Sequence, residues 1–170
     1  MKIVLLLLFF LFVLKADTKE LTIKAIVLNK INQFINYSGV EDEFNICSYS
    51  NKELFLSFQK LYKDKKYKNH SITVRDIKEI DDVKSCKILY ATALDELIVK
   101  KIASSNDSGI LLVTDEIKYI DHGFMIAFYF QDKKLRFVVN HKAMIDANLK
   151  VNYRLLNVAS KVVNIVKVTK

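Results

Sequence analysis

The chain has 170 residues, of which 51% are apolar and 27% charged, and it includes 11 Phe and 8 Tyr. So much apolar material excludes intrinsic disorder, and the absence of Pro with only three Gly excludes collagen-like chains and proline-rich linkers. The two Cys are too few for a disulfide-dense miniprotein, and no apolar run reaches the 18 residues expected of a polytopic membrane protein. The length favours one domain.

The N-terminus has the layout of a secretory signal peptide. Lys2 precedes a twelve-residue apolar run, Ile3 to Leu14, which is followed by Lys15-Ala16-Asp17. As a helix this run would span about 18 Å, whereas the hydrocarbon core of a bilayer is about 30 Å thick. We predict a signal peptide over residues 1–16 and a single exported domain over residues 17–170; the alternative is an uncleaved tether.

The formal net charge is +8, and removal of Lys2 and Lys15 with the signal peptide lowers it to +6. The basic residues are scattered or lie in short clusters such as Lys63-Asp64-Lys65-Lys66-Tyr67-Lys68, with acidic residues between them. Nucleic-acid-binding proteins gather positive charge on one element or alternate it with stacking aromatics. We interpret the lysines as a solubilising surface and expect no nucleic-acid partner.

Cys47 and Cys86 are the only cysteines. An oxidising compartment allows two thiols to persist as a disulfide, and closing a loop of this length contributes about 4 kcal/mol on the chain-entropy model. We predict a structural disulfide; the alternative is a redox-sensing one.

The first predicted element after the signal peptide is an amphipathic helix. Its apolar residues recur at intervals of three and four. They are Leu21, Ile23, Ile26, Val27, Ile31, Phe34 and Ile35. We predict that the helix ends near Tyr37, with Gly39 as its stop.

Strands and helices then alternate. A strand is predicted over residues 44–49, and Asn51 is placed to cap a helix extending to about Tyr62. The inward side chains of that helix are predicted to be Leu54, Phe55, Phe58 and Leu61. Further strands are predicted over residues 71–74, 87–91 and 110–113, with a helix over 94–103 that directs Leu97, Ile98 and Ile102 inward. The last of these strands is wholly apolar, which suits a sheet covered by helices on both faces.

The last third of the chain is different. Two β-rich runs, over residues 124–130 and 135–140, predict an antiparallel hairpin at the edge of the sheet or as its extension. A short helix over 141–147 and a C-terminal helix from about Asn152 follow. The apolar stripe of the C-terminal helix comprises Leu155, Leu156, Val158, Ala159, Val162, Val163 and Val166. The expected fold class is α/β: a layered mixed sheet flanked by helices, with a C-terminal β-hairpin and a closing helix.

The sequence contains none of the common motifs for phosphate, dinucleotide, zinc-protease, serine-hydrolase or dithiol chemistry. His70, His122 and His141 are far apart in sequence, and none has a second metal ligand four residues away. Acidic pairs such as Asp115-Glu116 lie at predicted helix starts or loops, where carboxylates favour the helix dipole. We therefore expect no cofactor, no metal and no catalytic residues.

Three segments near the C-terminus carry a family resemblance. They are G-F-M-I-A-F-Y-F from Gly123, K-L-R-F-V-V-N ending at Asn140, and A-M-I-D-A-N-L-K-V-N-Y-R-L-L-N-V-A from Ala143 to Ala159. This order resembles the YfiR-like family of exported bacterial proteins. The family's closing segment contains a G-x-M-I-x-F strand, an R-F-x-x-N strand and a short helix before L-L-x-x-A. The positions of Lys24-Ala25 and of the two cysteines extend the resemblance over nearly the whole mature chain.

The resemblance implies a periplasmic regulatory protein, often a homodimer. It would bind the sensor domain of a membrane-bound signalling protein, namely a diguanylate cyclase, and hold it inactive. Cyclic-di-GMP output would fall and biofilm formation would be restrained. Such a protein has no need of catalytic residues, but it does need exposed apolar surface flanked by charge.

Two sets of residues are candidates for binding. Phe124, Tyr129 and Phe130 on the predicted hairpin, together with the Val/Ile-rich C-terminal helix, are candidates for the partner surface, and each also suits the core. A second set flanks the same region and suits an anionic small molecule, which it would bind through charge-assisted hydrogen bonds. This set is Arg136, Asn140 and Arg154. The alternative is that the two arginines are surface charges and that Asn140 caps the following helix.

Two other functions remain open. The first is a periplasmic module that binds a small ligand and serves a different sensor, such as a histidine kinase. The second is an exported enzyme that uses Asp121, His122 and His141 in a cleft.

Overall fold

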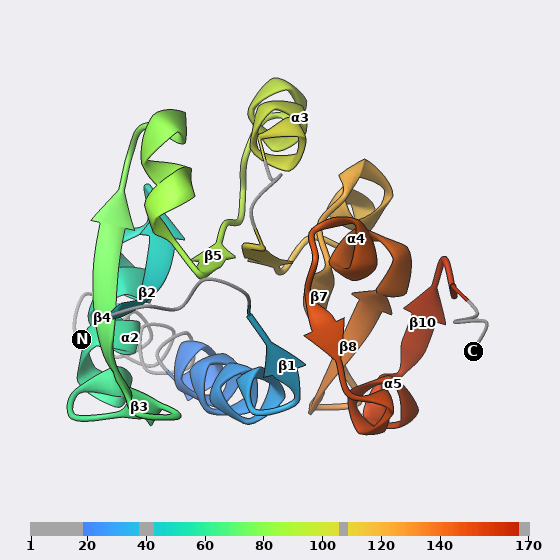
Figure 1. Cartoon of the computed structure of the whole chain (residues 1–170), viewed down its shortest axis with the longest axis horizontal. Helices are drawn as coiled ribbons and strands as arrows, with labels where there is room; N and C mark the ends of the chain where they lie inside the picture. Colours follow the sequence, from blue (N-terminus) through green and yellow to red (C-terminus); the bar gives the residue numbers. More distant parts are fainter. Residues whose placement is uncertain (1–18, 38–42, 106–108, 167–170) are drawn as a thin grey trace, which may run out of the picture.

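The computed structural model describes residues 19–37, 43–105 and 109–166 (Figure 1). The predicted signal peptide over residues 1–16 and the predicted helix stop at Gly39 lie outside this part of the chain. The described elements follow a helix over residues 19–32 in the order β1 (Ile35–Asn36), β2 (Glu43–Tyr49), α2 (Lys52–Tyr62), β3 (Lys66–Tyr67), β4 (His70–Ile77), η1 (Ile80–Ser85), β5 (Ile88–Tyr90), α3 (Glu96–Ser104), β6 (Leu111–Thr114), η2 (Ile117–His122), β7 (Ile126–Gln131), β8 (Lys134–Asn140), α4 (His141–Asp146), β9 (Lys150–Val151), α5 (Tyr153–Val158) and β10 (Lys161–Val163).

An eight-stranded mixed sheet forms the centre of the fold, with the strand order β10-β8-β7-β6-β5-β2-β4-β3. Strands β4, β2, β5, β6 and β7 are parallel to one another, whereas β3 and β8 are antiparallel to β4 and β7. The sheet curls across the molecule from β3 and β4 at one side to β10 at the other (Figure 1). The predicted fold class is confirmed, including the antiparallel hairpin, which extends the sheet.

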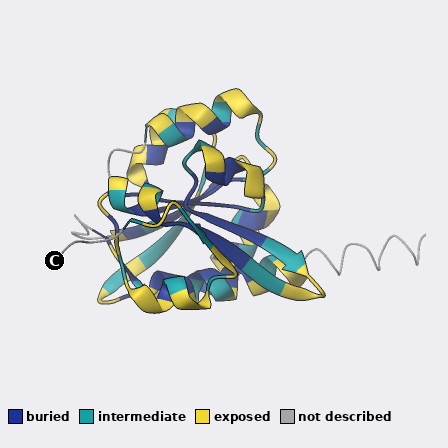
Figure 2. Ribbon diagram, turned by 90° about the vertical axis from the view of Figure 1, so that its right-hand side faces the viewer, coloured by how far each residue is buried: buried dark blue, intermediate teal, exposed yellow. Residues whose placement is uncertain are grey.

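Helices cover both faces of this sheet (Figure 2). On one face the helix 19–32, α2 and the buried side chains of α4 and α5 enclose a core rich in aromatic residues. On the other face η1, α3 and η2 enclose a second core. Side chains alternate between these cores along β2, β5 and β6, as Ile46 and Cys47 do in β2.

Local sequence explains the two longer internal helices. The Asn51 side chain accepts a hydrogen bond from the Leu54 N–H at 2.9 Å, as predicted for the cap of α2. Asp95 caps α3 in the same way, and Val99 and Ile102 of α3 are buried. Leu97 is 63% exposed, so the prediction that it faces the core is wrong. It lies two residues before Val99, which places it on a different side of the helix.

Both ends of the chain differ from prediction. The first helix ends at residue 32 rather than near Tyr37, because Ile35–Asn36 pair with β9 as a separate two-stranded ribbon. At the other end α5 stops at Val158, and Lys161–Val163 form β10, which pairs in parallel with β8. The predicted C-terminal helix is therefore correct only for its first two turns. The β-branched Val162 and Val163 lie in register with Val139 and Asn140 of β8, which a continuing helix would not contact.

A disulfide joins Cys47 on β2 to Cys86, which follows η1, with a Cα–Cα distance of 5.9 Å. Both residues are buried in the second core. The predicted pairing is present, and its burial favours the structural role over the redox-sensing one because access governs thiol exchange.

Candidate partner-binding surface

The three hairpin aromatics proposed for partner binding lie in different environments. Phe124 precedes β7 and is fully buried, with its ring centroid 5.5 Å from that of Tyr119. It belongs to the second core, so a partner cannot reach it in this structure. Tyr129 and Phe130 are half-buried and, as neighbours on β7, point to opposite faces of the sheet.

Tyr129 holds the last strand in place. Its hydroxyl donates to the Ser160 Oγ at 2.9 Å, and that Oγ donates to the Phe137 carbonyl at 2.6 Å. The Ser160 N–H also donates to the Phe137 carbonyl. The turn before β10 is therefore tied to the hairpin by side-chain and backbone hydrogen bonds together.

Phe130 faces the helix 19–32. The Lys24 ammonium lies 5.8 Å from its ring centroid, which is within the range of a cation–π contact. The same ammonium forms an ion pair with Asp115 at 2.9 Å, and the Tyr90 hydroxyl donates to the other oxygen of that carboxylate. Burial, and then the charge of Asp115, raises the pKa of Tyr90 well above its ordinary value, so the phenol keeps its proton as a donor.

This polar cluster lies where Tyr90 ends β5 and Asp115 follows β6. Ligands of open α/β sheets bind at such carboxyl ends, near the point where strand order reverses, here between β2 and β5. The charged and polar atoms of Lys24, Tyr90 and Asp115 are paired with one another. The arrangement therefore stabilises the contact between the first helix and the sheet.

The three residues proposed for an anionic ligand do not meet in one place. Asn140 is 4% exposed and caps α4 through its side-chain oxygen, while its Nδ2 donates to the Ile120 carbonyl at 3.0 Å. The cap interpretation of Asn140 is thus confirmed. Arg136 lies four residues earlier on the same face of β8, about 13 Å away along the strand. Arg154 is exposed on α5, whose Leu155 packs in the core of the other face.

The Arg136 Nε is buried and has no hydrogen-bond partner among the described residues, as is also true of one side-chain atom each of Asn32, Tyr37 and Asn45. The residue itself is half-buried, opposite Tyr129 in the hairpin register. A buried donor without an acceptor is uncommon in folded proteins.

The C-terminal segment presents apolar side chains to solvent. Tyr153, Val158 and Ile165 are 65%, 67% and 67% exposed, which are the largest exposed fractions among the large apolar residues that the structure describes. Tyr153 and Val158 lie on α5 and Ile165 follows β10, and for brevity we call these exposed residues of the C-terminal segment the C-terminal surface. Arg154 and Lys161 are exposed in the same segment and supply positive charge beside it.

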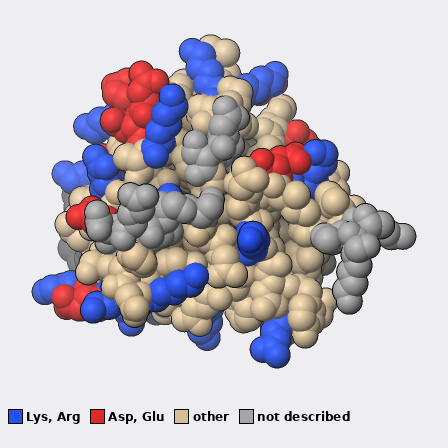
Figure 3. Space-filling model, in the orientation of Figure 1, with Lys and Arg blue, Asp and Glu red and all other residues tan. Residues whose placement is uncertain are grey.

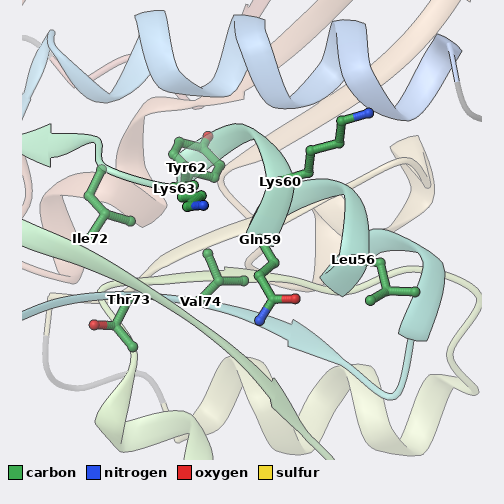
Figure 4. A pocket seen from close by; sticks show the side chains of 8 residues that line it. All are labelled: Leu56, Gln59, Lys60, Tyr62, Lys63, Ile72, Thr73 and Val74. Carbon is green, nitrogen blue, oxygen red and sulfur yellow. The ribbon is translucent and has the colours of Figure 1, made fainter.

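A groove on the opposite side of the molecule was not predicted (Figure 4). It lies between α2 and β4 and has a volume of about 590 Å³. Leu56, Ile72 and Val74 give it an apolar lining, and Lys60 and Lys63 line it from α2. Gln59 projects from α2 toward β4 (Figure 4). The lysine cluster after α2, which we interpreted as a solubilising surface, was the only trace of this site in the sequence.

The residues of the enzymatic alternative are not assembled. His141 is buried at the start of α4, where its Nδ1 accepts from the Val166 N–H at 3.3 Å, while Asp121 is exposed on η2. In the part of the chain that the structure describes, no hydrogen bond joins Asp121, His122 and His141, and no cluster of three or more metal-ligating side chains occurs. No helix in these ranges is long and apolar enough to cross a membrane.

Two solved structures resemble this chain in part. A conserved domain protein from Vibrio cholerae O1 biovar El Tor is similar with a TM-score of 0.54 at 12% identity, over 81% of this chain and 59% of that chain. The ABC domain from Streptococcus pneumoniae in complex with L-Trp has a TM-score of 0.49 at 9% identity, over 71% of this chain and 56% of that one. The first similarity shows the fold alone, and this chain spans just under three fifths of that protein. No curated protein matches the chain.

A match to a family model establishes the family of this chain, which the similar structures do not. The model described as YfiR/HmsC-like (DUF4154) matches residues 21–160, from the first helix through α5 to the turn before β10. This range contains both cysteines and all three of the segments that carry the resemblance. The chain belongs to the YfiR/HmsC-like family.

Proposed function

We propose that this protein is an exported periplasmic regulator that binds the sensor domain of a membrane-bound diguanylate cyclase and inhibits it. Cyclic-di-GMP output would fall as a result. The observation that carries this proposal is the family match over residues 21–160. In this proposal residues 1–16 direct export, residues 17–170 form one domain that needs no cofactor, and the mature protein forms a homodimer.

The C-terminal surface is our candidate for the contact with the sensor. Its three exposed apolar residues would be desolvated in an interface, and Arg154 and Lys161 would form part of its polar rim. Tyr129 contributes indirectly in this proposal because it fixes the turn from which β10 begins.

Site-specific photo-cross-linking in the native cells tests this proposal. A photoreactive side chain at Val158 should capture a membrane protein that has a cyclase output domain. The matched control is Leu97 on α3, which is similarly exposed and apolar but lies on the other face of the sheet. Equal capture from both positions, or capture of the protein itself alone, would contradict the assignment of this surface.

Cyclic-di-GMP provides the functional readout. Deletion of the protein should raise the cellular cyclic-di-GMP level. Expression of a Val158→Glu variant in the deletion strain should leave the level high, whereas expression of Leu97→Glu should return it to the level of the parent strain.

Two measurements test the other parts of the proposal. The intact mass of the mature protein tests cleavage after Ala16, and sedimentation velocity tests the homodimer.

Arg136 supports a second candidate function, the binding of a small anion. Its buried Nε lacks an acceptor among the described residues, so an anion would satisfy a donor that is otherwise unpaired. Calorimetric titration with citrate and with inorganic phosphate tests this function, with Arg154→Gln as the control for Arg136→Gln. Equal loss of binding in the two variants would indicate nonspecific attraction.

A further inference from the structure

Strand β4 has an open outer side over most of its length. Strand β3 pairs with it only at Ser71 and His70, and the Ile72 N–H donates to the Lys65 carbonyl at 3.2 Å. Within the described ranges no strand lies beyond the segment from Thr73 to Ile77 on that side. The sheet therefore ends there in an exposed edge.

The hydrogen-bond directions along β4 identify which peptide groups are free. The Ile77 carbonyl accepts from the Ser50 N–H after β2, whereas the Ile72 N–H points the other way, toward β3. Successive residues of a strand direct their peptide groups to alternate sides. Val74 and Asp76 therefore direct their N–H and C=O groups outward. A row of unpaired groups of this kind is a template for another strand.

The groove between α2 and β4 lies directly beside this edge, because Val74 belongs to both. An extended segment added to β4 directs every second side chain to the α2 face of the sheet. On that face it would meet Ile72, Val74 and the half-exposed Leu56. The groove can accept apolar side chains at alternate positions of such a segment.

The charge around the groove is strongly one-sided. Residues 60–68 contain five lysines and one acidic residue, Asp64, and all six are exposed. Basic side chains surround the α2–β3 corner at the lower left of Figure 3. Among the described residues, no ion pair includes Lys60, Lys63, Lys65 or Lys66. A second copy of the same edge would bring like charges together, which disfavours self-pairing and favours an acidic occupant.

We propose that the open edge of β4 and the α2/β4 groove bind an acidic extended segment of a partner protein by adding it to the sheet as a strand. Val74 and Asp76 supply the backbone hydrogen bonds, and the groove takes the apolar side chains. Lys60 and Lys63 attract the acidic ones. This surface is separate from the C-terminal surface and does not depend on the identity of the sensor.

A labelled peptide, blocked at both ends, in which Val and Glu alternate along one side of the strand and Thr fills the other side (Val-Thr-Glu-Thr-Val-Thr-Glu-Thr-Val), tests the proposal with the purified protein, because its Val and Glu side chains then face α2 together. Its binding, followed by fluorescence anisotropy, should weaken with added salt. It should weaken about tenfold in a Lys60→Glu/Lys63→Glu variant, because two favourable charge contacts become two repulsive ones. The matched control, Lys133→Glu/Lys134→Glu on the β7–β8 hairpin, changes the net charge equally and should bind within twofold of the parent protein.

Two further readouts distinguish strand addition from simple charge attraction. A peptide with Pro in place of the central Val should lose binding, because Pro cannot donate to the ladder. In the complex, amide exchange should slow at Val74 and Asp76, while Arg75 and Ile77 stay protected by β2 as in the free protein.

Three results would overturn the proposal. These are equal loss of binding in both charge variants, tight binding of the Pro peptide, and no new protection at Val74 and Asp76. Vesicles of phosphatidylglycerol are the probe for a membrane surface. Lysine-dependent binding to them in preference to the peptide would likewise overturn the proposal. Since no cyclase is present in these assays, their outcome is independent of the proposed function.

Discussion

The two faces of the sheet are stabilised by different means. The face covered by the helix 19–32 and α2 packs large rings, with the Phe58 centroid 5.6 Å from that of Tyr62 and 5.5 Å from that of Tyr90. Two buried hydroxyls on this face also reach distant backbone: Tyr62 donates to the Ala25 carbonyl and Tyr67 to the Ile35 carbonyl. We call it the aromatic face.

The other face has less bulk and a covalent link. Its core is mainly aliphatic, and two of its three covering elements are the short 3₁₀-helices η1 and η2. The disulfide between Cys47 and Cys86 attaches the end of η1 to β2 in the middle of the sheet. A six-residue 3₁₀-helix buries little surface, so a cross-link compensates where packing area is small. We call it the disulfide face.

The largest expected effect is on the disulfide face. A Cys47→Ala/Cys86→Ala variant should lose about 4 kcal/mol of unfolding free energy, because the chain-entropy model assigns that value to a loop of this length. Urea denaturation of the variant and of the parent protein, with and without reductant, measures the loss. The parent should lose as much on reduction; a loss below about 1 kcal/mol would mean that packing alone holds η1.

The next effect is on the aromatic face. Lys24 and Asp115 are 11% and 24% exposed, so a Lys24→Met variant leaves a largely buried carboxylate without its cation. We expect a loss of about 3 kcal/mol. Adding Asp115→Asn should restore part of it. The control is Lys100→Met in the exposed pair with Glu96, which should leave the denaturation midpoint unchanged. Equal effects at both lysines would remove the distinction between buried and exposed pairs.

A smaller effect tests how far the disulfide face extends. Ala127 and Val138 form a separate small cluster on the same side of the sheet near β10, with Tyr129 packed against it, and Ser160 connects Tyr129 to the Phe137 carbonyl. A Ser160→Ala variant should lose about 1 kcal/mol, the value of a typical hydrogen bond. Amide exchange should quicken at Lys161–Val163 and remain unchanged in β5. A uniform change across the sheet would show that β10 unfolds together with the rest.

The buried tyrosines of the aromatic face should also make the free energy of unfolding depend on pH in the alkaline range. Burial raises the pKa of Tyr37, Tyr62 and Tyr90 above the ordinary value of 10.0. Above about pH 10 the unfolded chain releases phenolic protons that the folded protein retains, so the free energy of unfolding falls as the pH rises. These tyrosines add no such dependence below that pH. Denaturation midpoints between pH 8 and pH 11 measure the effect.

A Tyr90→Phe variant should reduce the pH dependence of the unfolding free energy above pH 10. The number of protons released on unfolding should fall by up to one, because the variant lacks one phenol whose pKa differs between the folded and unfolded states. The control is Tyr153→Phe, because Tyr153 is 65% exposed. An unchanged slope in Tyr90→Phe would show that Tyr90 titrates in the folded protein as it does when unfolded.

Much of the fold follows from local sequence. Asn51 and Asn140 cap helices because a short polar side chain placed before a helical stretch accepts a hydrogen bond from its first turn. The runs that form β2, β6, β7 and β8 carry β-branched and aromatic residues and were located within a few positions. The family could also be inferred, because the segments that carry the resemblance are contiguous in sequence.

The candidate sites were harder to predict, since exposure depends on what packs against a residue. Phe124 and Tyr129 belong to one run of apolar residues, yet Phe124 is buried against η2 and Tyr129 is tied to a turn that comes 31 residues later. Leu97 is apolar and lies in the same apolar stretch of α3 as the buried Val99, but it faces solvent.

By itself the sequence determined the order and type of most elements, the identity of the only possible disulfide pair and the family. Capping, periodicity and motif are properties of residues close together in the chain. Only the tertiary structure decided that β2 lies between β4 and β5, that β10 replaces the end of a helix, and that β4 is left with an open edge beside a lysine-lined groove. Each of these features depends on contacts between segments far apart in sequence. The free energy of such contacts cannot be read from patterns of neighbouring residues.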